Sequence, residues 1–260
     1  MSSFHAADGA LLSFAECGPR GGIPLVLVHG WLADATVWEP LVEALGERHR
    51  TIAVDLRGFG ASNGAQGAFS IESFSNDLAD LIAAIDLDPV VVVGHSMGAA
   101  VAQRFAIDHP EAVEGLVLIA AVPASGVAFP PKIEAMFRAA ASDKVVAARW
   151  LDGLAYGEWT PELSAVLHAA AARANHAAAA QSLEAWLHAD FAAEAATIET
   201  PTLVIAPSAD RPMTPDFLRK NVADVITDSR FVVLDKAGHY ATVERPTEIS
   251  ALIDHFVESL

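Results

Sequence analysis

Residues 90–98 read Val-Val-Val-Val-Gly-His-Ser-Met-Gly, and a run with helical spacing continues from there to Ile107. Four valines in a row are typical of a strand that is buried on both faces of a sheet. The glycines at 94 and 98 permit a tight turn into the helix, because side chains there would strike the neighbouring backbone. Such a G-x-S-x-G turn holds the serine hydroxyl clear of the sheet, at the positive end of the helix dipole. The stretch therefore predicts that Ser96 is a catalytic nucleophile.

Short apolar runs without polar alternation recur on both sides of this stretch. They lie at Leu25–Val28, Thr51–Val54, Leu116–Val122, Thr202–Ala206 and Phe231–Leu234. Segments with helical spacing accompany them, at Thr36–Glu47, Ser70–Ile85, Met97–Ile107, Pro215–Val225 and Thr247–Ser259. The turn signal Asp8-Gly9, between Ser3–His5 and Leu11–Glu16, indicates a hairpin at one edge of the sheet. This alternation predicts an α/β fold with a mostly parallel sheet covered by helices on both faces.

The middle of the chain, residues 123–200, has a different character. It is rich in alanine, shows no clear strand, and holds three of the five tryptophans of the chain. Its helical pieces are bounded by Pro130-Pro131, Gly153, Gly157 and Pro161. We therefore predict an α/β core formed by residues 1–122 and 201–260, with residues 123–200 inserted as a helical cap. The tryptophans either pack the small core of this cap or face an apolar ligand.

The composition limits the class of protein. The chain of 260 residues is 53% hydrophobic, which excludes intrinsic disorder, and its formal charge of -17 disfavours nucleic acid as a partner. The single cysteine, Cys17, excludes an intramolecular disulfide and a cysteine-based zinc cluster. No secretory signal and no stretch of about 20 apolar residues is visible, so we expect a cytoplasmic protein without a membrane segment.

A serine hydroxyl is a poor nucleophile at neutral pH, so it needs a base. His239 lies in Ala237-Gly238-His239, directly after the predicted strand Phe231–Leu234. This places it at the carboxyl end of a strand, where ligand sites of open α/β sheets form. We therefore predict that His239 is the base, against the alternative of a loop histidine that only bonds the backbone.

The base in turn needs an acid that orients it. Asp210 follows the predicted strand Thr202–Ala206 and is the only carboxylate at that strand end before Asp216. No carboxylate lies between Gly115 and Glu134, which removes the end of the preceding strand as a source. Asp210 is therefore the predicted acid, and its alternative role is to cap the helix that follows Pro212.

Catalysis also needs donors aimed at the oxyanion of a tetrahedral intermediate. We predict that the backbone N–H groups of Met97 and Trp31 are these donors. Trp31 lies in the loop after Leu25–Val28, and Gly30 lets the backbone of that loop approach closely. His29 and His95 are expected to have structural roles in their loops. The candidate pocket residues adjoin strand ends or lie in the cap: Gly30, Trp31, Val122, Phe129, Trp186 and Tyr240.

These residues resemble the motifs of the α/β-hydrolase superfamily along essentially the whole chain. The resemblance rests on His29-Gly30-Trp31, Asp55-Leu-Arg-Gly-Phe-Gly-Ala-Ser62, the turn at 94–98 and Gly238-His239. Within the superfamily, these motifs are similar to those of bacterial esterases and of cofactor-free haloperoxidases or perhydrolases. The resemblance implies an eight-stranded sheet, a helical cap and a Ser96–Asp210–His239 triad. One departure is Pro207-Ser208-Ala209 before the acid, where a glycine is usual.

Other sites are disfavoured by the residues present. Asn63 replaces the third glycine of a dinucleotide-binding pattern that would begin at Gly58. His168 and His176 have no carboxylate at ligand spacing, so no metal site is expected there. A serine at position 96 excludes the epoxide hydrolases and haloalkane dehalogenases of this fold, which need a carboxylate nucleophile.

The sequence therefore predicts a serine hydrolase that acts on a small, largely apolar carboxylic ester or lactone, without a metal or organic cofactor. The net negative charge adds a weak preference for neutral substrates. A perhydrolase, or an enzyme that hydrolyses carbon–carbon bonds, would use the same triad. A receptor for small ligands on the same fold is the alternative without catalysis. The oligomeric state is not indicated by the sequence.

Overall fold

The computed structural model describes residues 1–87, 89–157 and 159–260. Its centre is an eight-stranded sheet with the order β1-β2-β4-β3-β5-β6-β7-β8. The strands are β1 (Ser2–His5), β2 (Leu11–Cys17), β3 (Leu25–Val28), β4 (Thr51–Asp55), β5 (Val90–His95), β6 (Val113–Ile119), β7 (Thr202–Pro207) and β8 (Ser229–Leu234). Strand β2 is antiparallel to β1 and β4, and every later pairing is parallel. The predicted α/β fold and its edge hairpin are therefore confirmed.

The strand that carries the candidate nucleophile lies in the middle of the sheet. β5 pairs with β3 on one side and β6 on the other, and all its residues are buried. The apolar run at Leu116–Val122 was expected to be the next strand, but β6 ends at Ile119. The chain leaves the sheet at Ala120, which has a φ of 48°, and the Val122 N–H donates to the carbonyl of Ser96. Ala120 still donates to the carbonyl of Ile205 in β7, whereas Val122 braces the turn rather than the sheet.

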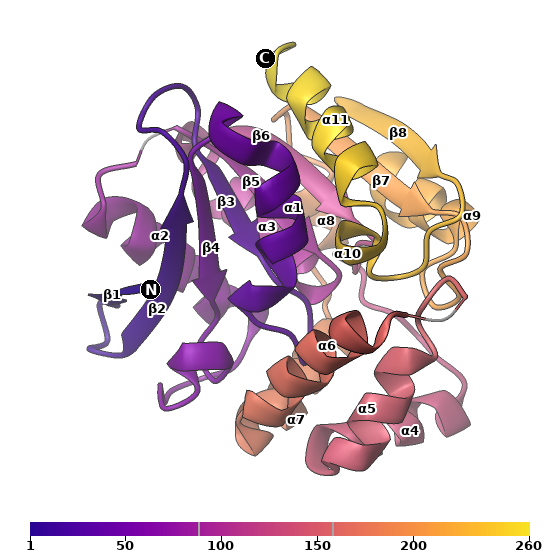
Figure 1. Ribbon diagram of the computed structural model, residues 1–260. Coiled ribbons are helices and arrows are strands. Elements are labelled where there is room, and N and C mark those ends of the chain that lie inside the picture. Colours follow the sequence, from indigo (N-terminus) through magenta and orange to yellow (C-terminus); the bar gives the residue numbers. More distant parts are fainter. Residues whose placement is uncertain (88, 158) are drawn as a thin grey trace.

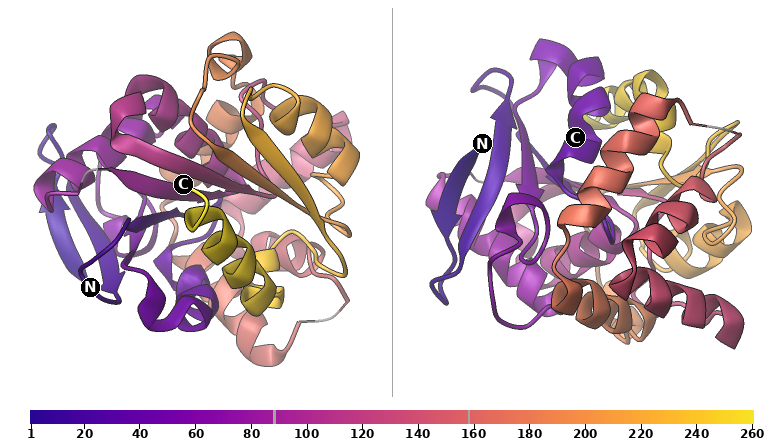
Figure 2. Two further views of the ribbon diagram at one scale, coloured as in Figure 1. Left: turned by 90° about the horizontal axis from the view of Figure 1, so that it is seen from above. Right: turned by 60° about the horizontal axis from the view of Figure 1, so that its bottom comes forward.

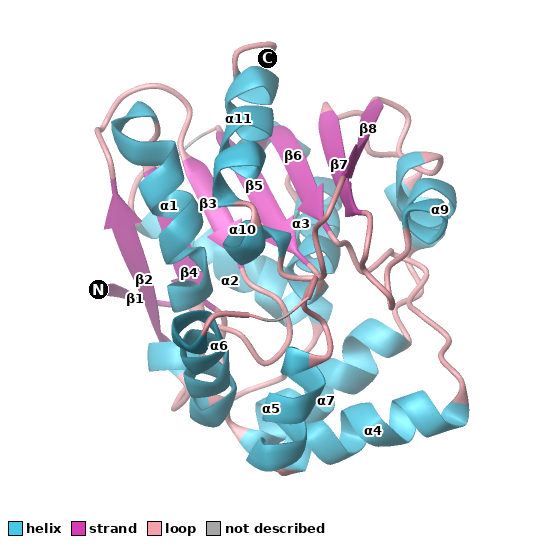
Figure 3. Ribbon diagram, turned by 45° about the vertical axis from the view of Figure 1, so that its right-hand side comes forward, coloured by secondary structure: helices cyan, strands magenta, loops and turns pink. Residues whose placement is uncertain are grey.

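Helices cover both faces of the sheet (Figure 3). α1 (Glu39–Leu45) and α11 (Pro246–Val257) pack together on one face, and α2 (Ile71–Ala84) and α3 (Met97–Asp108) pack together on the other. Each buries the apolar side expected from its spacing, such as Phe74, Leu78 and Leu81 of α2. The predicted helix Thr36–Glu47 is interrupted, because Pro40 has no N–H to continue a helix that starts at Ala35.

The segment between β6 and β7 is helical. It contains α4 (Pro131–Ser142), α5 (Lys144–Asp152), α6 (Pro161–Arg173), α7 (His176–Leu187) and α8 (Ala192–Ala195). Figures 1 and 2 show α4 to α7 gathered beyond the arrowheads of the central strands. The carboxyl end of β5 therefore points toward these helices, and residues of α4, α5 and α7 line the same cavity as Ser96. In the part of the chain that the structure describes, no helix is long and apolar enough to cross a membrane.

Candidate active site

Ser96 occupies a strained turn between β5 and α3. Its φ of 54° and ψ of -119° lie in a region that residues other than glycine rarely adopt. Three backbone hydrogen bonds hold it there. The Ser96 N–H donates to the carbonyl of Ile119 at 3.0 Å, and the Ser96 carbonyl accepts from Ala99 at 3.0 Å and Val122 at 3.1 Å. The surrounding backbone thus fixes the hydroxyl-bearing residue at the end of the central strand.

The flanking glycines have a steric reason. A Cβ at position 98 would lie 2.1 Å from the carbonyl oxygen of Val28, and one at position 94 would lie 2.5 Å from that of Gly98. Neither distance is compatible with a side chain, and the obstacles are backbone atoms that cannot swing aside. Close packing of α3 against β3 and β5 therefore requires glycine at both positions.

The structure brings the three predicted catalytic side chains into one hydrogen-bonded row. His239 Nε2 lies 3.0 Å from Ser96 Oγ, and His239 Nδ1 lies 2.7 Å from Asp210 Oδ2. All three side chains are largely buried, with Asp210 only 2% exposed. Because a carboxylate can only accept, Nδ1 carries the proton and Nε2 is free to accept from the serine hydroxyl.

Two loops after parallel strands supply these partners. Asp210 follows β7, and its second oxygen, Oδ1, accepts from the Met213 N–H at 3.1 Å. His239 follows β8. The two strands are neighbours in the sheet, so residues distant in sequence meet at its carboxyl edge.

The loop that carries one predicted oxyanion donor, the backbone N–H of Trp31, lies close to Ser96, and the other donor, Met97, follows Ser96 directly. Gly30 and Trp31 follow β3, and a Cβ on Gly30 would lie 3.0 Å from the Cβ of Ser96. The Trp31 indole N–H donates to the carbonyl of Ala179 at 2.8 Å, which fixes this loop against α7. Among the described residues, no protein acceptor takes the backbone N–H of Trp31 or Met97.

A small apolar cavity of about 30 Å³ opens onto Ser96 and His239. Three of the predicted pocket residues, Trp31, Trp186 and Tyr240, line it. Gly30, Val122 and Phe129 are not among the described residues that do so. Phe129 lies one layer out, with its ring 5.2 Å from that of Phe137. The remaining lining residues were not predicted from the sequence: Phe137, Trp150, Leu151, Leu154, Pro212 and Met213.

Two further histidines support the loops of the site. His95 Nε2–H donates to the carbonyl of His239 at 2.8 Å, so the residue before the serine holds the base loop. His29 Nε2 accepts from the Leu56 N–H at 3.1 Å, and its Nδ1 lies 2.8 Å from the carbonyl of Gly30. Burial lowers the pKa of both imidazoles, that of His95 to about 3. Both therefore stay neutral and act as hydrogen-bonding spacers.

The lowered pKa of His95 predicts acid sensitivity. The unfolded chain takes up a proton on this residue below its ordinary pKa of 6.5, whereas the folded chain does not until about pH 3. The free energy of unfolding therefore falls as the pH falls through this window, by about 2 kcal/mol from His95 between pH 7 and pH 5. The glutamine side chain in His95→Gln is neutral and can donate to the same carbonyl. In this variant, the fall in the free energy of unfolding between pH 7 and pH 5 should be smaller by about 2 kcal/mol. Urea unfolding at the two pH values measures it, and an equal acid loss in the variant would contradict the assignment.

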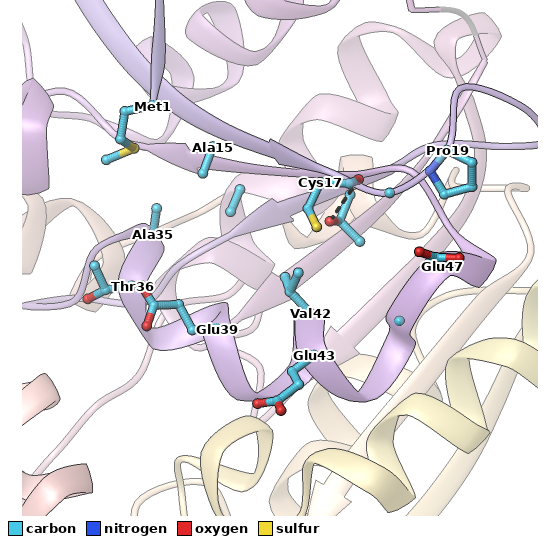
Figure 4. Close-up of a pocket in the computed structure, with 14 residues that line it drawn as sticks. Met1, Ala15, Cys17, Pro19, Ala35, Thr36, Glu39, Val42, Glu43 and Glu47 are labelled. Atoms are coloured by element: carbon cyan, nitrogen blue, oxygen red, sulfur yellow. Dashed lines mark hydrogen bonds between the residues drawn. The ribbon is translucent and has the colours of Figure 1, made fainter.

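A larger hollow, of about 970 Å³, lies far from this row, between β2, β4 and α1 (Figure 4). Cys17 is the only thiol in it, and the described residues that line it include no histidine to serve as a base. Its acidic residues, Glu39, Glu43 and Glu47, stand on the helical side. Elsewhere in the described residues, no group of three or more His, Cys, Asp or Glu side chains gathers in a way that could hold a metal ion. Of these two hollows, the one at Ser96 and His239 is therefore the candidate active site.

Sequence comparison relates the chain to one protein family and to several individual proteins. A sequence model described as the Alpha/beta hydrolase family matches residues 25–252. A putative non-heme bromoperoxidase, BpoC, from Mycobacterium tuberculosis is 30% identical over 260 residues, covering 92% of this chain and 95% of its own length. A pimeloyl-(acyl-carrier protein) methyl ester esterase from Aeromonas hydrophila is 32% identical over 251 residues, covering 91% and 96%. An uncharacterized protein from Mycobacterium tuberculosis is 33% identical over 118 residues, so the match spans 45% of this chain but only 34% of that relative.

Solved structures agree over nearly the full length. An esterase from Exiguobacterium antarcticum superimposes with a TM-score of 0.91 at 22% identity, covering 99% of both chains. An enol-lactonase from Burkholderia xenovorans LB400 superimposes with a TM-score of 0.88 at 25% identity, covering 99% of this chain and 100% of its own. At 22% identity, the similarity to the Exiguobacterium antarcticum esterase supports the fold alone.

Proposed function

The chain belongs to the alpha/beta hydrolase family and is an enzyme of that fold; from this premise we propose that it is a serine hydrolase acting on a small, largely apolar carboxylic ester or lactone. The observation that carries the proposal is the hydrogen-bonded row from Ser96 through His239 to Asp210. A binding protein would have no need of a buried carboxylate that orients an imidazole toward a serine. We therefore favour catalysis over a receptor role.

In the first half of the proposed reaction, Ser96 Oγ attacks the carbonyl carbon while His239 Nε2 accepts its proton. Asp210 stabilises the imidazolium that forms and keeps its ring in place. The N–H groups of Trp31 and Met97 hold the developing oxyanion, which is often the largest electrostatic contribution. His239 then gives its proton to the leaving alkoxide, and the acyl group remains on Ser96.

In the second half, water attacks the acyl-enzyme. His239 Nε2 takes a proton from the water and returns it to Ser96 Oγ as the tetrahedral intermediate breaks down. The products are the acid and the free enzyme, and no group beyond this chain and water is needed. For a lactone, the alcohol and acid products are one molecule.

The lining of the cavity supports a neutral acyl group. No aspartate, glutamate, lysine or arginine is among the described residues that line it, and aromatic rings from Trp31, Phe137 and Trp186 surround the space. Burying a charged substrate here would cost several kcal/mol without a partner. We also propose that residues 123–200 act as a cap, because Phe137, Trp150 and Trp186 all come from this segment.

The length of the acyl chain of the substrate should decide the rate of ester hydrolysis. The cavity of about 30 Å³ is small, so it favours a short acyl group such as that of an acetyl ester. We expect kcat/KM for p-nitrophenyl acetate to exceed that for the octanoate by at least about tenfold, because a longer chain must displace packed rings. Phe137→Ala, which removes one ring from the wall, should narrow this ratio. A flat or inverted chain-length series in the unsubstituted enzyme would count against the assignment of the cavity as the acyl site.

Perhydrolysis is a second candidate activity, favoured by the relative named as a non-heme bromoperoxidase, which the match covers almost completely. Here hydrogen peroxide would replace water, and the acyl group would pass from Ser96 to a peroxide oxygen to give a peracid. Bromination of monochlorodimedone in acetate, peroxide and bromide separates the two activities. Halogenation that depends on both acetate and Ser96 would support this reading.

A further inference from the structure

Glu244 joins two segments that meet at the base loop. It is the last residue of α10 (Ala241–Glu244) and is half-buried. Its Oε2 accepts from the Gly238 N–H at 2.7 Å, directly before His239. Its Oε1 accepts from the Tyr156 N–H at 3.2 Å and from the Trp159 indole N–H at 3.1 Å. One carboxylate thus binds the base loop with one oxygen and the connection between α5 and α6 with the other.

The same two segments touch at His239 itself. The His239 N–H donates to the carbonyl of Leu154 at 3.0 Å, and Leu154 also lines the cavity. A Cβ on Gly238 would lie 2.5 Å from both that carbonyl oxygen and the Tyr156 nitrogen. Glycine is therefore required at 238 for the cap segment to lie directly on the base loop.

Two further contacts hold the backbone around His239. His95 holds the His239 carbonyl, and the Trp159 ring meets the ring of Tyr240 edge-on at 5.9 Å. The backbone of His239 is thus fixed at its N–H by the cap and at its carbonyl by the turn that carries Ser96. A shift of about 1 Å in a catalytic group can cost on the order of 100-fold in rate. The position of the cap segment therefore bears directly on the Nε2–Oγ distance.

We propose that Glu244 is a positioning residue that couples the placement of the cap residues Leu154, Tyr156 and Trp159 to the catalytic placement of His239. The inference rests on the proposed function, since it assumes that His239 is the base. A carboxylate suits this role because its bonds to N–H donors are charge-assisted and it can accept on both oxygens at once. Glutamine at this position offers one acceptor and would face the second set of donors with its own NH₂ group.

The coupling predicts a loss in kcat rather than in binding. We expect Glu244→Gln to lower kcat for p-nitrophenyl acetate roughly 10- to 100-fold, with KM changed less than about threefold. Trp159→Phe removes only one cap donor and keeps a ring against Tyr240, so its loss should be smaller. In the double variant the losses should not multiply, because both substitutions break the same link. Glu43→Gln, an exposed change on α1, is the matched control and should keep the kcat of the unsubstituted enzyme.

Two outcomes separate failure of this inference from failure of the proposed function. If the unsubstituted enzyme neither hydrolyses the ester nor is labelled at Ser96 by a fluorophosphonate, the proposed function is wrong and the coupling falls with it. If it does both, but Glu244→Gln keeps full kcat, the coupling alone is overturned. Losses that multiply in the double variant, or that appear as a raised KM, would equally overturn it. Thermal unfolding of each variant shows that the comparison is made on folded protein, and Trp159→Phe carries the test if Glu244→Gln does not fold.

Discussion

Replacing Ser96 with alanine should lower kcat/KM for p-nitrophenyl acetate by on the order of 10⁵- to 10⁶-fold. The substitution removes the oxygen that lies 3.0 Å from His239 Nε2, so no acyl-enzyme can form. The fold should be unaffected, because alanine keeps the Cβ and the backbone bonds to Ile119, Ala99 and Val122 remain. The strain of a φ of 54° is also the same in both proteins. Initial rates, with circular dichroism and thermal unfolding, check both halves of this expectation.

Ser3→Ala is the matched control, since Ser3 is exposed on the edge strand β1 and far from the row. It should keep the full rate and the full labelling by a fluorophosphonate probe. In Ser96→Ala, intact-mass spectrometry should show no phosphonyl adduct. Turnover close to that of the unsubstituted enzyme, or an adduct at another serine, would show that the nucleophile is elsewhere.

The row could be predicted from the sequence because each member is marked locally. The glycines at 94 and 98 are demanded by contacts to neighbouring backbone, so the turn leaves its pattern in the residues themselves. Asp210 and His239 each follow a short apolar run, and parallel strands bring such run ends to one edge. Signals of this kind survive small errors in strand limits. The run at Leu116–Val122 shows such an error, because apolar residues that brace the turn resemble strand residues.

The wall of the cavity could not be predicted in the same way. Phe137 and Trp150 lie on α4 and α5, and which side of each helix faces Ser96 depends on how the helices pack across the sheet edge. The helical spacing marks the apolar side of each helix, but it does not say which of those apolar residues reach the cavity and which pack inside the cap. Met213 lies nearer to a residue that the sequence marks, because its N–H donates to the carboxylate of Asp210, three residues before it. Glu244 is five residues after His239, but only the tertiary structure brings the cap donors to it.

Asp210→Asn should lower kcat by about 10⁴-fold and change KM little. In the enzyme, Oδ2 accepts from His239 and Oδ1 accepts from the Met213 N–H. Asparagine has one acceptor and must leave one of these donors facing its NH₂ group. If the amide oxygen serves Met213, the NH₂ group drives the proton of His239 to Nε2, and the imidazole cannot accept from Ser96. If the oxygen serves His239, two donors face each other at Met213 in a buried site, and the loop is displaced.

Both arrangements impair the base, and the fluorophosphonate reaction provides a second test of that loss. Labelling of Ser96 should slow in parallel with kcat, because both need the serine proton to be removed. Asp216→Asn is the control, since Asp216 is the next carboxylate along the chain and is exposed at the start of α9 (Pro215–Leu218). It should keep the full rate. A large loss in Asp216→Asn with little in Asp210→Asn would move the acid to the later position, whereas the 2.7 Å contact between Asp210 and His239 Nδ1 makes the reverse the expected result.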